Sequence, residues 1–427
     1  MAYTDFIAAI DLGTSHMVGM VGTKNATGAL SIIAYEVENS GTCIRRGCVY
    51  NVKETASKIK RLILKLENKL GGTKIGQVYV GLGGQSLRSI EHTVCKVLGM
   101  EGVVTEEIID SLYQECKDYR PDMLTVLDVV SPSYFLDDKP ESNPVGVPCS
   151  RIEARYKLIV GRPSLKLNIV NSISEQAKIE IAGILVSPLA LGDVVLSDNE
   201  KDLGCALIGF GAGVTTISVY KGGKLASLSV VPFGGNLITK DITNLRVVES
   251  EAERLKITYG SAKADRDNDM TIQVSLADGM GLREIKLAEL NGVIEARMDE
   301  ILENVYARLE ATGLMSVLGA GIVITGGGAA LKNLPAVMSE RLKMEVRYSA
   351  VRKGVVASGD LVVASNPEYA VAVGLLAKGT KNCALYIPPK PEPKIEPVVE
   401  PEPTVEPTPE PEPVKEKPKK EKKKGPG

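Results

Sequence analysis

The chain has 427 residues, a length that predicts two or more lobes, and its hydrophobic content of 44% and charged content of 24% are those of a soluble globular protein. Its net charge of −2 gives no overall field that would recruit nucleic acid or anionic lipid. The seven cysteines form no Cys-x-x-Cys pair and the chain has two histidines, which argues against a zinc site. The N-terminus has no basic segment followed by an apolar run, so we expect no signal peptide, and no apolar run approaches the ~20 residues that a membrane span needs.

The chain opens with a hairpin whose tip is rich in glycine and hydroxyl groups. An apolar run at 7–10 predicts a buried strand, a polar turn follows at 11–15, and a second apolar run covers 17–21. Such a tip can present successive backbone N–H groups to an anion, and Gly13 allows close approach. Asp11, at the end of the strand, is placed to hold a hydrated Mg²⁺ beside phosphates. An ordinary hairpin with a polar turn explains the pattern equally well.

The first half of the chain continues as α/β structure with one interruption. The elements predicted before the interruption are a strand at 30–38, a helix at 53–70 and a strand at 78–82. From about residue 86, short strands at 92–98, 125–131 and 155–160 surround a helix at 105–119, which predicts a small inserted α+β domain of roughly 80 residues. After it we expect a strand at 165–170, a helix at 174–183 and a strand at 184–187.

A second hairpin at 205–220 repeats the architecture of the first. An apolar strand, a turn rich in glycine and threonine and another apolar strand follow one another in both places. Two such hairpins about 200 residues apart indicate a duplicated, two-lobed protein with a cleft between the lobes. The two turns would clamp a polyphosphate from opposite sides.

The second half is mainly helical after this hairpin. We expect helices at 236–245, 250–259, 287–312 and 366–376, a strand region at 270–277 and a strand at 320–325. The glycines at 326–328 follow that last strand and suit close approach to a nucleotide base or sugar, although a plain strand-to-helix turn is the alternative. A solvated helical face likewise explains Glu253 and Lys256 on the second helix.

Several ordered motifs give the chain a specific resemblance. It resembles the actin/Hsp70/sugar-kinase superfamily through DLGTS at 11–15, GFGAGVT at 209–215, ExxK at 253–256, TGGGA at 325–329 and YAVAVG at 369–374. Within that superfamily it is similar to the FtsA family of bacterial cell-division proteins through RGCVYN at 46–51, VYVGLGG at 78–84, FGGN at 233–236 and EAERLKITYG at 251–260. The resemblance covers residues 5–380.

The resemblance implies an α/β, two-lobed actin-like (ribonuclease H-like) ATPase fold with an inserted α+β subdomain and a disordered C-terminal tail. The implied divisions are a first-lobe core at 5–85 and 162–197, an SHS2-like insertion at 86–161, a second-lobe core at 198–234 and 320–380, an outer second-lobe subdomain at 235–319, and the tail at 388–427.

The same resemblance implies ATP and Mg²⁺ as ligands and assigns no catalytic residue. Asp11 would organise Mg²⁺ through water. The residues implied to contact phosphates are Gly13, Thr14 and Ser15 in the first turn and Gly211, Ala212, Gly213, Val214 and Thr215 in the second. The residues implied to contact the nucleoside are Glu253 and Lys256 for ribose and adenine, and Gly326, Gly327 and Gly328 for the adenosine pocket.

The second turn departs from the family pattern at its first position. The superfamily usually has Asp where this chain has Gly209, and Val214 and Thr216 also differ from the common Thr and Asp. An Asp at that position helps to hold the metal and its waters for in-line attack. We therefore expect ATP binding with hydrolysis that is slow or absent.

The function implied is an ATP-binding scaffold that links the FtsZ ring to the cytoplasmic membrane and recruits later division proteins. Its implied partners are the C-terminal peptide of FtsZ, other divisome proteins through the insertion, and further copies of itself in filaments, with no nucleic acid. The expected location is the cytoplasm, at the inner face of the membrane at the division site. The alternatives are a PilM-like pilus-assembly ATPase and a phosphotransferase or phosphatase of the same fold. Gly209 argues against the phosphotransferase or phosphatase, which needs a catalytic carboxylate near the γ-phosphate, and the pilus-assembly protein is the harder alternative to reject.

The segment from 388 onward is dominated by Pro, Glu and Lys, and this composition predicts an extended, disordered tail. FtsA proteins usually carry an amphipathic membrane-binding helix after such a linker, and no apolar face is seen in 388–427. A lysine cluster follows Lys415 and is interrupted by Glu416 and Glu421. We expect this segment to bind anionic membranes weakly and in a salt-sensitive manner.

Overall fold

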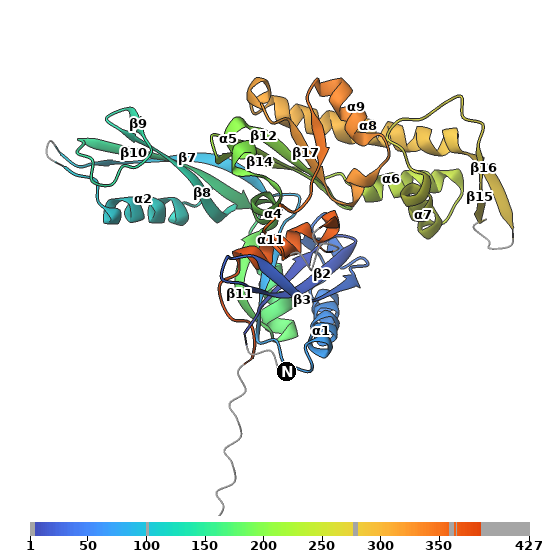
Figure 1. Cartoon of the computed structure of the whole chain (residues 1–427), viewed down its shortest axis with the longest axis horizontal. Coiled ribbons are helices and arrows are strands. Elements are labelled where there is room, and N and C mark those ends of the chain that lie inside the picture. Colours follow the sequence, from blue (N-terminus) through green and yellow to red (C-terminus); the bar gives the residue numbers. More distant parts are fainter. Residues whose placement is uncertain (1–4, 100–101, 276–280, 358–362, 364, 386–427) are drawn as a thin grey trace, which may run out of the picture. The chain divides into compact units, whose positions relative to one another are not determined.

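Two five-stranded sheets with corresponding strand orders carry the two hairpins that the sequence predicts (Figure 1). The computed structural model describes residues 5–99, 102–275, 281–357, 363 and 365–385, all within one compact unit that spans 1–386. The expected disordered tail at 388–427 lies outside the described residues.

The first sheet has the strand order β11-β6-β1-β2-β3. Its strands are β1 (Ile7–Leu12), β2 (His16–Lys24), β3 (Leu30–Asn39), β6 (Gln77–Leu82) and β11 (Glu180–Val186). Strand β1 pairs antiparallel with β2, which leaves 13–15 as the turn, and pairs parallel with β6 on its other side. The two-residue strands β4 (Ile44–Arg45) and β5 (Cys48–Val49) pair with each other.

Helix α1 (Val52–Lys69) packs on this sheet through apolar residues that recur every three to four positions. Asn51 caps the helix by accepting a hydrogen bond from the Glu54 backbone N–H at 3.1 Å. The buried Leu62 and Leu66 pack against Gly19 of β2, where a Cβ atom would lie 2.8 Å from Leu66 Cδ1. Glycine in the middle of β2 therefore lets the helix and the strand pack closely without moving these leucine side chains.

The second sheet, β14-β13-β12-β17-β18, repeats this arrangement. Its strands are β12 (Cys205–Phe210), β13 (Thr215–Lys221), β14 (Lys224–Val231), β17 (Ile322–Thr325) and β18 (Val346–Tyr348). Strand β12 pairs antiparallel with β13 and parallel with β17, as β1 does with β2 and β6. The duplication predicted from the two hairpins is thus present in strand pairing as well as in sequence.

Between β6 and β11 the chain forms a four-stranded antiparallel sheet that packs against one helix and has its own core. Its elements are β7 (Arg88–Val97), α2 (Glu106–Asp118), β8 (Thr125–Leu136), β9 (Lys139–Glu141) and β10 (Arg151–Gly161). This insertion also contacts the second sheet, since the Leu228 backbone N–H donates to Ser89 Oγ at 2.8 Å and the Leu225 N–H donates to Ser131 Oγ at 3.0 Å.

The segment between β14 and β17 is mostly helical and shares a core with the second sheet. Its elements are α6 (Gly235–Ile242), α7 (Glu249–Tyr259), β15 (Thr271–Ser275), β16 (Leu282–Lys286) and α8 (Leu287–Glu310), with short 3₁₀ helices at Thr243–Leu245 and Met315–Val317. Helix α9 (Leu334–Leu342) follows β17, after a 3₁₀ turn at Gly327–Ala330. Ile294, Met298 and Ile301 of α8 are almost fully buried in the shared core.

Two helices, α4 (Ser187–Val195) and α11 (Ala370–Lys378), pack tightly against each other. A Cβ atom at Gly374 would lie 2.3 Å from the Ala190 carbonyl oxygen, so the helices approach closely only because residue 374 is glycine. Asp193 at the end of α4 forms ion pairs with Lys378 of α11 at 2.7 Å and with Lys201 of α5 (Asp198–Leu203) at 2.8 Å. A 3₁₀ turn at Pro367–Tyr369 precedes α11.

The structure corrects the prediction for the chain between the insertion and α4. The segment 165–170, expected as a strand, is helix α3 (Ser164–Val170), and a π-helix at Asn171–Ala177 and strand β11 replace the helix expected at 174–183. Leu165, Leu167 and Ile169 alternate as in a strand, but Leu167 is 57% exposed and the other two are buried four residues apart on one helical face. Among the residues that the structure describes, no helix is both long and apolar enough to cross a membrane.

Candidate functional site

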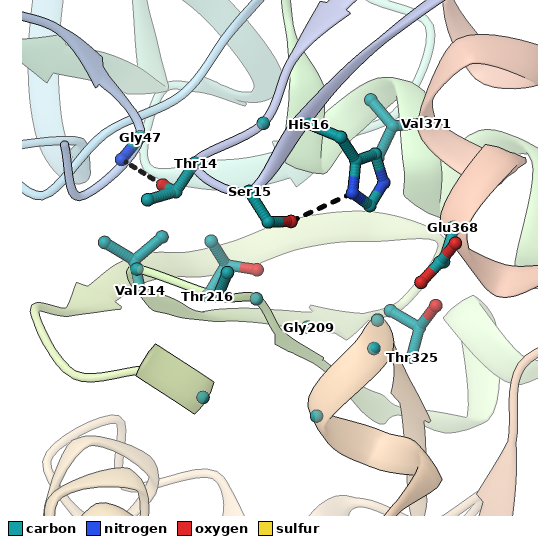
Figure 2. Close-up of a pocket in the computed structure, with 18 of the residues that line it drawn as sticks. Thr14, Ser15, His16, Gly47, Gly209, Val214, Thr216, Thr325, Glu368 and Val371 are labelled. Atoms are coloured by element: carbon teal, nitrogen blue, oxygen red, sulfur yellow. Dashed lines mark hydrogen bonds between the residues drawn. The ribbon is translucent and has the colours of Figure 1, made fainter. Parts of the chain in front are cut away.

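A cavity of about 760 Å³ brings together both hairpin turns and the glycines that follow β17 (Figure 2). Ligand pockets commonly have volumes of this order. Its wall is built from the turns after β1 and β12, the first residues of α4 and α6, one side of α7, the 3₁₀ turn after β17 and the start of α11. All the residues that the sequence analysis proposed for ligand binding lie on this wall except Thr215.

The first turn is held in a conformation that requires glycine. A Cβ atom at Gly13 would lie 2.4 Å from the His16 carbonyl oxygen. The Thr14 hydroxyl accepts a hydrogen bond from the Gly47 backbone N–H at 2.9 Å, and Ser15 Oγ lies 2.9 Å from His16 Nδ1. The turn is therefore fixed before any ligand arrives, which lowers the cost of ordering it on binding.

The second turn lies directly against the first. A Cβ atom at Gly213 would lie 2.6 Å from Thr14 Oγ1, so a side chain there would separate the two turns. The carbonyl oxygens of Gly211 and Ala212 accept hydrogen bonds from the backbone N–H groups of Gly235 and Asn236, which begin α6. The two turns therefore line one cavity side by side, and their clamping of a polyphosphate stays a prediction.

Thr215 is placed differently from the other members of the second turn. Its side chain is fully buried, and its hydroxyl donates to the Phe233 carbonyl oxygen at 2.9 Å. The neighbouring Thr216 faces the cavity instead. Successive side chains of a strand point to opposite faces, so only one of the two threonines can line the cavity.

Asp11 lines the cavity near the end of β1. Burial raises the pKa of its carboxyl from 3.8 to about 6, although a hydrogen bond from the Leu12 backbone opposes the shift. Gly81 brings Asp11 close to Ser187, since a Cβ atom at that position would lie 3.1 Å from Asp11 Oδ1 and 2.5 Å from Ser187 Oγ. No group of three or more metal-binding side chains occurs in the described residues, so a metal here would need ligands from water or from a bound anion.

Glu253 and Lys256 form a fixed pair on the side of α7 that faces the cavity. Lys256 Nζ donates to Glu253 Oε2 at 2.7 Å, to Thr239 Oγ1 at 2.8 Å and to the Gly235 carbonyl oxygen at 3.2 Å. Thr239 also donates to Glu253. The Lys256 side chain is 13% exposed, so Lys256 does not lie on a solvated helical face, which was the alternative explanation from the sequence.

The glycines after β17 leave an open strip of backbone along the cavity. Gly326 has a φ of +87°, and a Cβ atom there would lie 2.5 Å from the Phe210 carbonyl oxygen. A Cβ atom at Gly327 would meet only Glu368 Oε1, at 3.6 Å. The Thr325 hydroxyl is buried on the same wall and has no hydrogen-bond partner in the described structure, so it is available to a ligand.

Several polar residues of the wall received no ligand-binding role from the sequence, and they include His16, Ser187, Asn236, Asn366 and Glu368. Figure 2 shows His16 and Glu368 on the same side of the cavity, beside Val371. A sequence signal existed for the segment at 366–368, because Asn366 caps the Glu368 N–H at 2.9 Å and Pro367 occupies the first helical position.

Two sequence comparisons with known proteins give the same family. A model of the cell division protein FtsA matches residues 206–374. The cell division protein FtsA of Porphyromonas gingivalis is 39% identical to the chain over 382 residues, which is 89% of this chain and 79% of that protein.

Solved structures support the fold. The PilM–PilN type IV pilus biogenesis complex matches with a TM-score of 0.59 and 16% identity, over 87% of this chain and 97% of the other. The MamK double helical filament matches with a TM-score of 0.50 and 11% identity, over 87% and 97% of the two chains. The two-lobed actin-like fold predicted from the sequence is confirmed.

Proposed function

The chain belongs to the FtsA family of cell-division proteins, and on that basis we propose that it is an ATP-binding scaffold that links the FtsZ ring to the cytoplasmic membrane at the division site. The observation that carries the nucleotide part of the proposal is the contact between the two glycine-rich turns on one cavity, which the open backbone strip at 326–328 also lines. Backbone N–H groups in such turns favour phosphate, and residues without Cβ atoms allow a nucleoside to approach.

The residues present suit a nucleoside triphosphate. Phosphates would contact Gly13, Thr14 and Ser15 from one side and Gly211, Ala212, Gly213 and Val214 from the other, and the Thr325 hydroxyl would gain the hydrogen-bond partner that it lacks. The nucleoside would lie between the Glu253–Lys256 pair and Gly326, Gly327 and Gly328. Thr215 would act from behind the second turn, by holding it to Phe233.

Mg²⁺ would be held by Asp11 through water, and its binding is expected to depend on pH. A carboxyl with a pKa of about 6 is about one-tenth ionised at pH 5, and only the carboxylate attracts the metal. The gain in ATP affinity on adding Mg²⁺ should therefore be about tenfold smaller at pH 5 than at pH 7. Calorimetry with and without Mg²⁺ at the two pH values measures this gain.

The variants Asp11→Asn and Asp128→Asn separate this effect from general changes in charge. Burial also raises the pKa of Asp128, which lies on β8 away from the cavity, so its variant should keep the Mg²⁺ dependence of the wild type. Asp11→Asn should lose that dependence at both pH values. Because folding raises the pKa of Asp11 from 3.8 to about 6, ionisation of this side chain lowers the stability of the ligand-free protein as the pH rises from about 4 to about 6. Asp11→Asn removes this charge, so it should raise the melting temperature at pH 7 but not at pH 4. A Mg²⁺ gain that survives in Asp11→Asn would show that the metal site lies elsewhere.

We propose that the outer subdomain at 235–319 binds the C-terminal peptide of FtsZ. Short peptides bind such surfaces through a few apolar anchors, and this subdomain exposes Leu282 by 69% at the start of β16. Deleting the FtsZ tail should abolish co-sedimentation with this chain. Leu282→Ser should weaken binding about tenfold, as expected for an interface anchor.

Leu64→Ser on α1 is the matched control, because Leu64 is a similarly exposed leucine, at 53%, outside this subdomain. It should leave FtsZ binding unchanged. Co-sedimentation that persists with tail-less FtsZ would place the contact on another part of FtsZ.

The remaining parts of the proposal rest on the family. Self-association into filaments is favoured by the shared fold with the MamK double helical filament, and the insertion at 86–161 presents a separate surface for other division proteins. Peripheral attachment to the inner face of the membrane and a cytoplasmic location are expected in the same way. Fluorescence imaging of the labelled chain in dividing cells tests the location directly, since a diffuse signal would contradict it.

A further inference from the structure

The charges on the cavity wall are mostly negative, although the proposed ligand is an anion. The acidic residues that line it are Asp11, Glu253 and Glu368. In the described part of the wall the groups that can carry positive charge are Lys256 and His16. Lys256 is engaged by Glu253, Thr239 and a backbone carbonyl, so its charge is already paired. A polyphosphate in this cavity therefore has one further protein cation available, the imidazolium form of His16.

His16 is oriented by its neighbour in the first turn. It is the first residue of β2 and is partly buried. Its Nδ1 atom lies 2.9 Å from Ser15 Oγ, which leaves Nε2 as the ring nitrogen open to another partner (Figure 2). The neutral ring carries its proton on Nε2 when the Ser15 hydroxyl donates to Nδ1, and on Nδ1 when the ring donates to Ser15. The protonated ring donates from both nitrogens, so in that form it presents an N–H donor from Nε2 whichever way the Ser15 hydrogen bond runs.

We propose that His16 is a phosphate-binding residue, whose Nε2–H donates a hydrogen bond to the phosphate chain of the bound nucleotide and whose protonation strengthens that bond. This inference rests on the proposed nucleotide site. The ligand chemistry that it selects is the polyphosphate of a nucleoside di- or triphosphate, since adenosine alone offers no anion to the ring. A hydrogen bond from a charged donor to a phosphate is stronger than one between neutral groups.

The other ionisable groups that line the cavity must be separated from this effect. Asp11 comes from β1, Glu368 from the turn before α11, and the Glu253–Lys256 pair from α7. Protonation of Asp11 weakens Mg²⁺ binding but also removes a negative charge near phosphates. The informative quantity is therefore the difference between wild type and a His16 variant under the same conditions, with Mg²⁺ removed by EDTA.

The first experiment compares ATP and adenosine binding by calorimetry at pH 6 and pH 8 in the wild type, His16→Gln, His16→Lys and His92→Gln. His92 is the second of the two histidines in the chain and stacks on Tyr119 in the insertion, with ring centroids 4.0 Å apart, so His92→Gln is the matched control. His16→Gln should weaken ATP binding about tenfold at pH 6 and much less at pH 8. His16→Lys should keep tight ATP binding at both pH values, and adenosine should bind all four proteins alike.

The second experiment observes the two imidazoles directly by ¹⁵N NMR. Adding ATP should move the signals of His16 and leave those of His92 unchanged, whereas adenosine should move neither. If His16→Gln is folded and binds ATP with the affinity and pH dependence of the wild type, the proposal for His16 is overturned while the nucleotide site stands. If the wild type binds no ATP at either pH, the nucleotide site itself is wrong, and the role of His16 falls with it.

Discussion

Replacing Gly327 with leucine is expected to weaken ATP binding about a hundredfold and leave the protein folded. A Cβ atom at this position meets only one protein atom within 4 Å, Glu368 Oε1 at 3.6 Å, so the fold has room for a side chain. That room is the cavity itself, because both Gly327 and Glu368 line it. A leucine would occupy the space proposed for adenosine, and overpacking of this kind costs on the order of 1–3 kcal/mol or more, which predicts a loss of affinity of about a hundredfold.

The neighbouring glycines do not offer the same test. Side chains at Gly326 and Gly328 would approach the Phe210 backbone to 2.5 and 3.1 Å, so substitutions there would disturb the fold before any ligand binds. A suitable control is Gly292→Leu on α8, where a Cβ atom meets nothing within 4 Å and the residue does not line the cavity. Calorimetry on both variants, with circular dichroism to verify folding, gives the comparison. A folded Gly327→Leu variant with unchanged affinity would show that the nucleotide lies elsewhere.

The sequence predicted the parts of this site that depend on local pattern. Each hairpin appears as an apolar run, a glycine-rich turn and a second apolar run, and this order determines which backbone groups meet at the turn. Their meeting on one cavity followed from the duplication, because two equivalent hairpins in two lobes place their turns on equivalent edges. The long helices were predicted for a similar reason, since α8 carries buried residues at helical spacing over its whole length.

What the sequence missed depends on register and on tertiary contact. Thr215 and Thr216 are chemically alike, and only the pairing of β13 with β12 and β14 decides which one faces the cavity. The segment at 165–170 alternates as a strand would, and its helical form depends on the burial of Leu165 and Ile169 in the core that they share with the first sheet. His16 and Glu368 lie about 350 residues apart in sequence, so no local pattern could have joined them.

Hydrolysis of ATP is expected to be far slower than the ~1–10³ s⁻¹ typical of metabolic enzymes. Gly209, in β12 opposite Thr216, lines the cavity where the superfamily usually has an Asp. Without that carboxylate, Asp11 is the acidic residue left beside the turns. A single carboxyl is a poor means of both holding a metal and orienting an attacking water. Phosphate release from Mg²⁺·ATP under steady-state conditions measures the rate.

Restoring the carboxylate is expected to require two changes. A Cβ atom at Gly209 would lie 2.7 Å from Thr216 Oγ1, so Gly209→Asp alone meets the threonine hydroxyl and should raise the rate little. Thr216→Ala alone should also leave the rate near that of the wild type, because it adds no carboxylate. The double variant removes the obstacle and should hydrolyse ATP faster, within the 10²–10⁴-fold range that a positioned acid or base typically contributes and nearer its lower end, because Val214 still differs from the common Thr.

The wild-type rate decides between a scaffold and an enzyme. A steady-state rate of 1 s⁻¹ or more in the unmodified chain would contradict the scaffold proposal and favour a phosphotransferase or phosphatase of the same fold. A slow wild type together with a faster double variant would instead locate the defect at one residue. The cavity would then bind ATP with its turns intact and lack only the carboxylate that turnover needs, which is the condition expected of a protein that uses nucleotide to set its conformation.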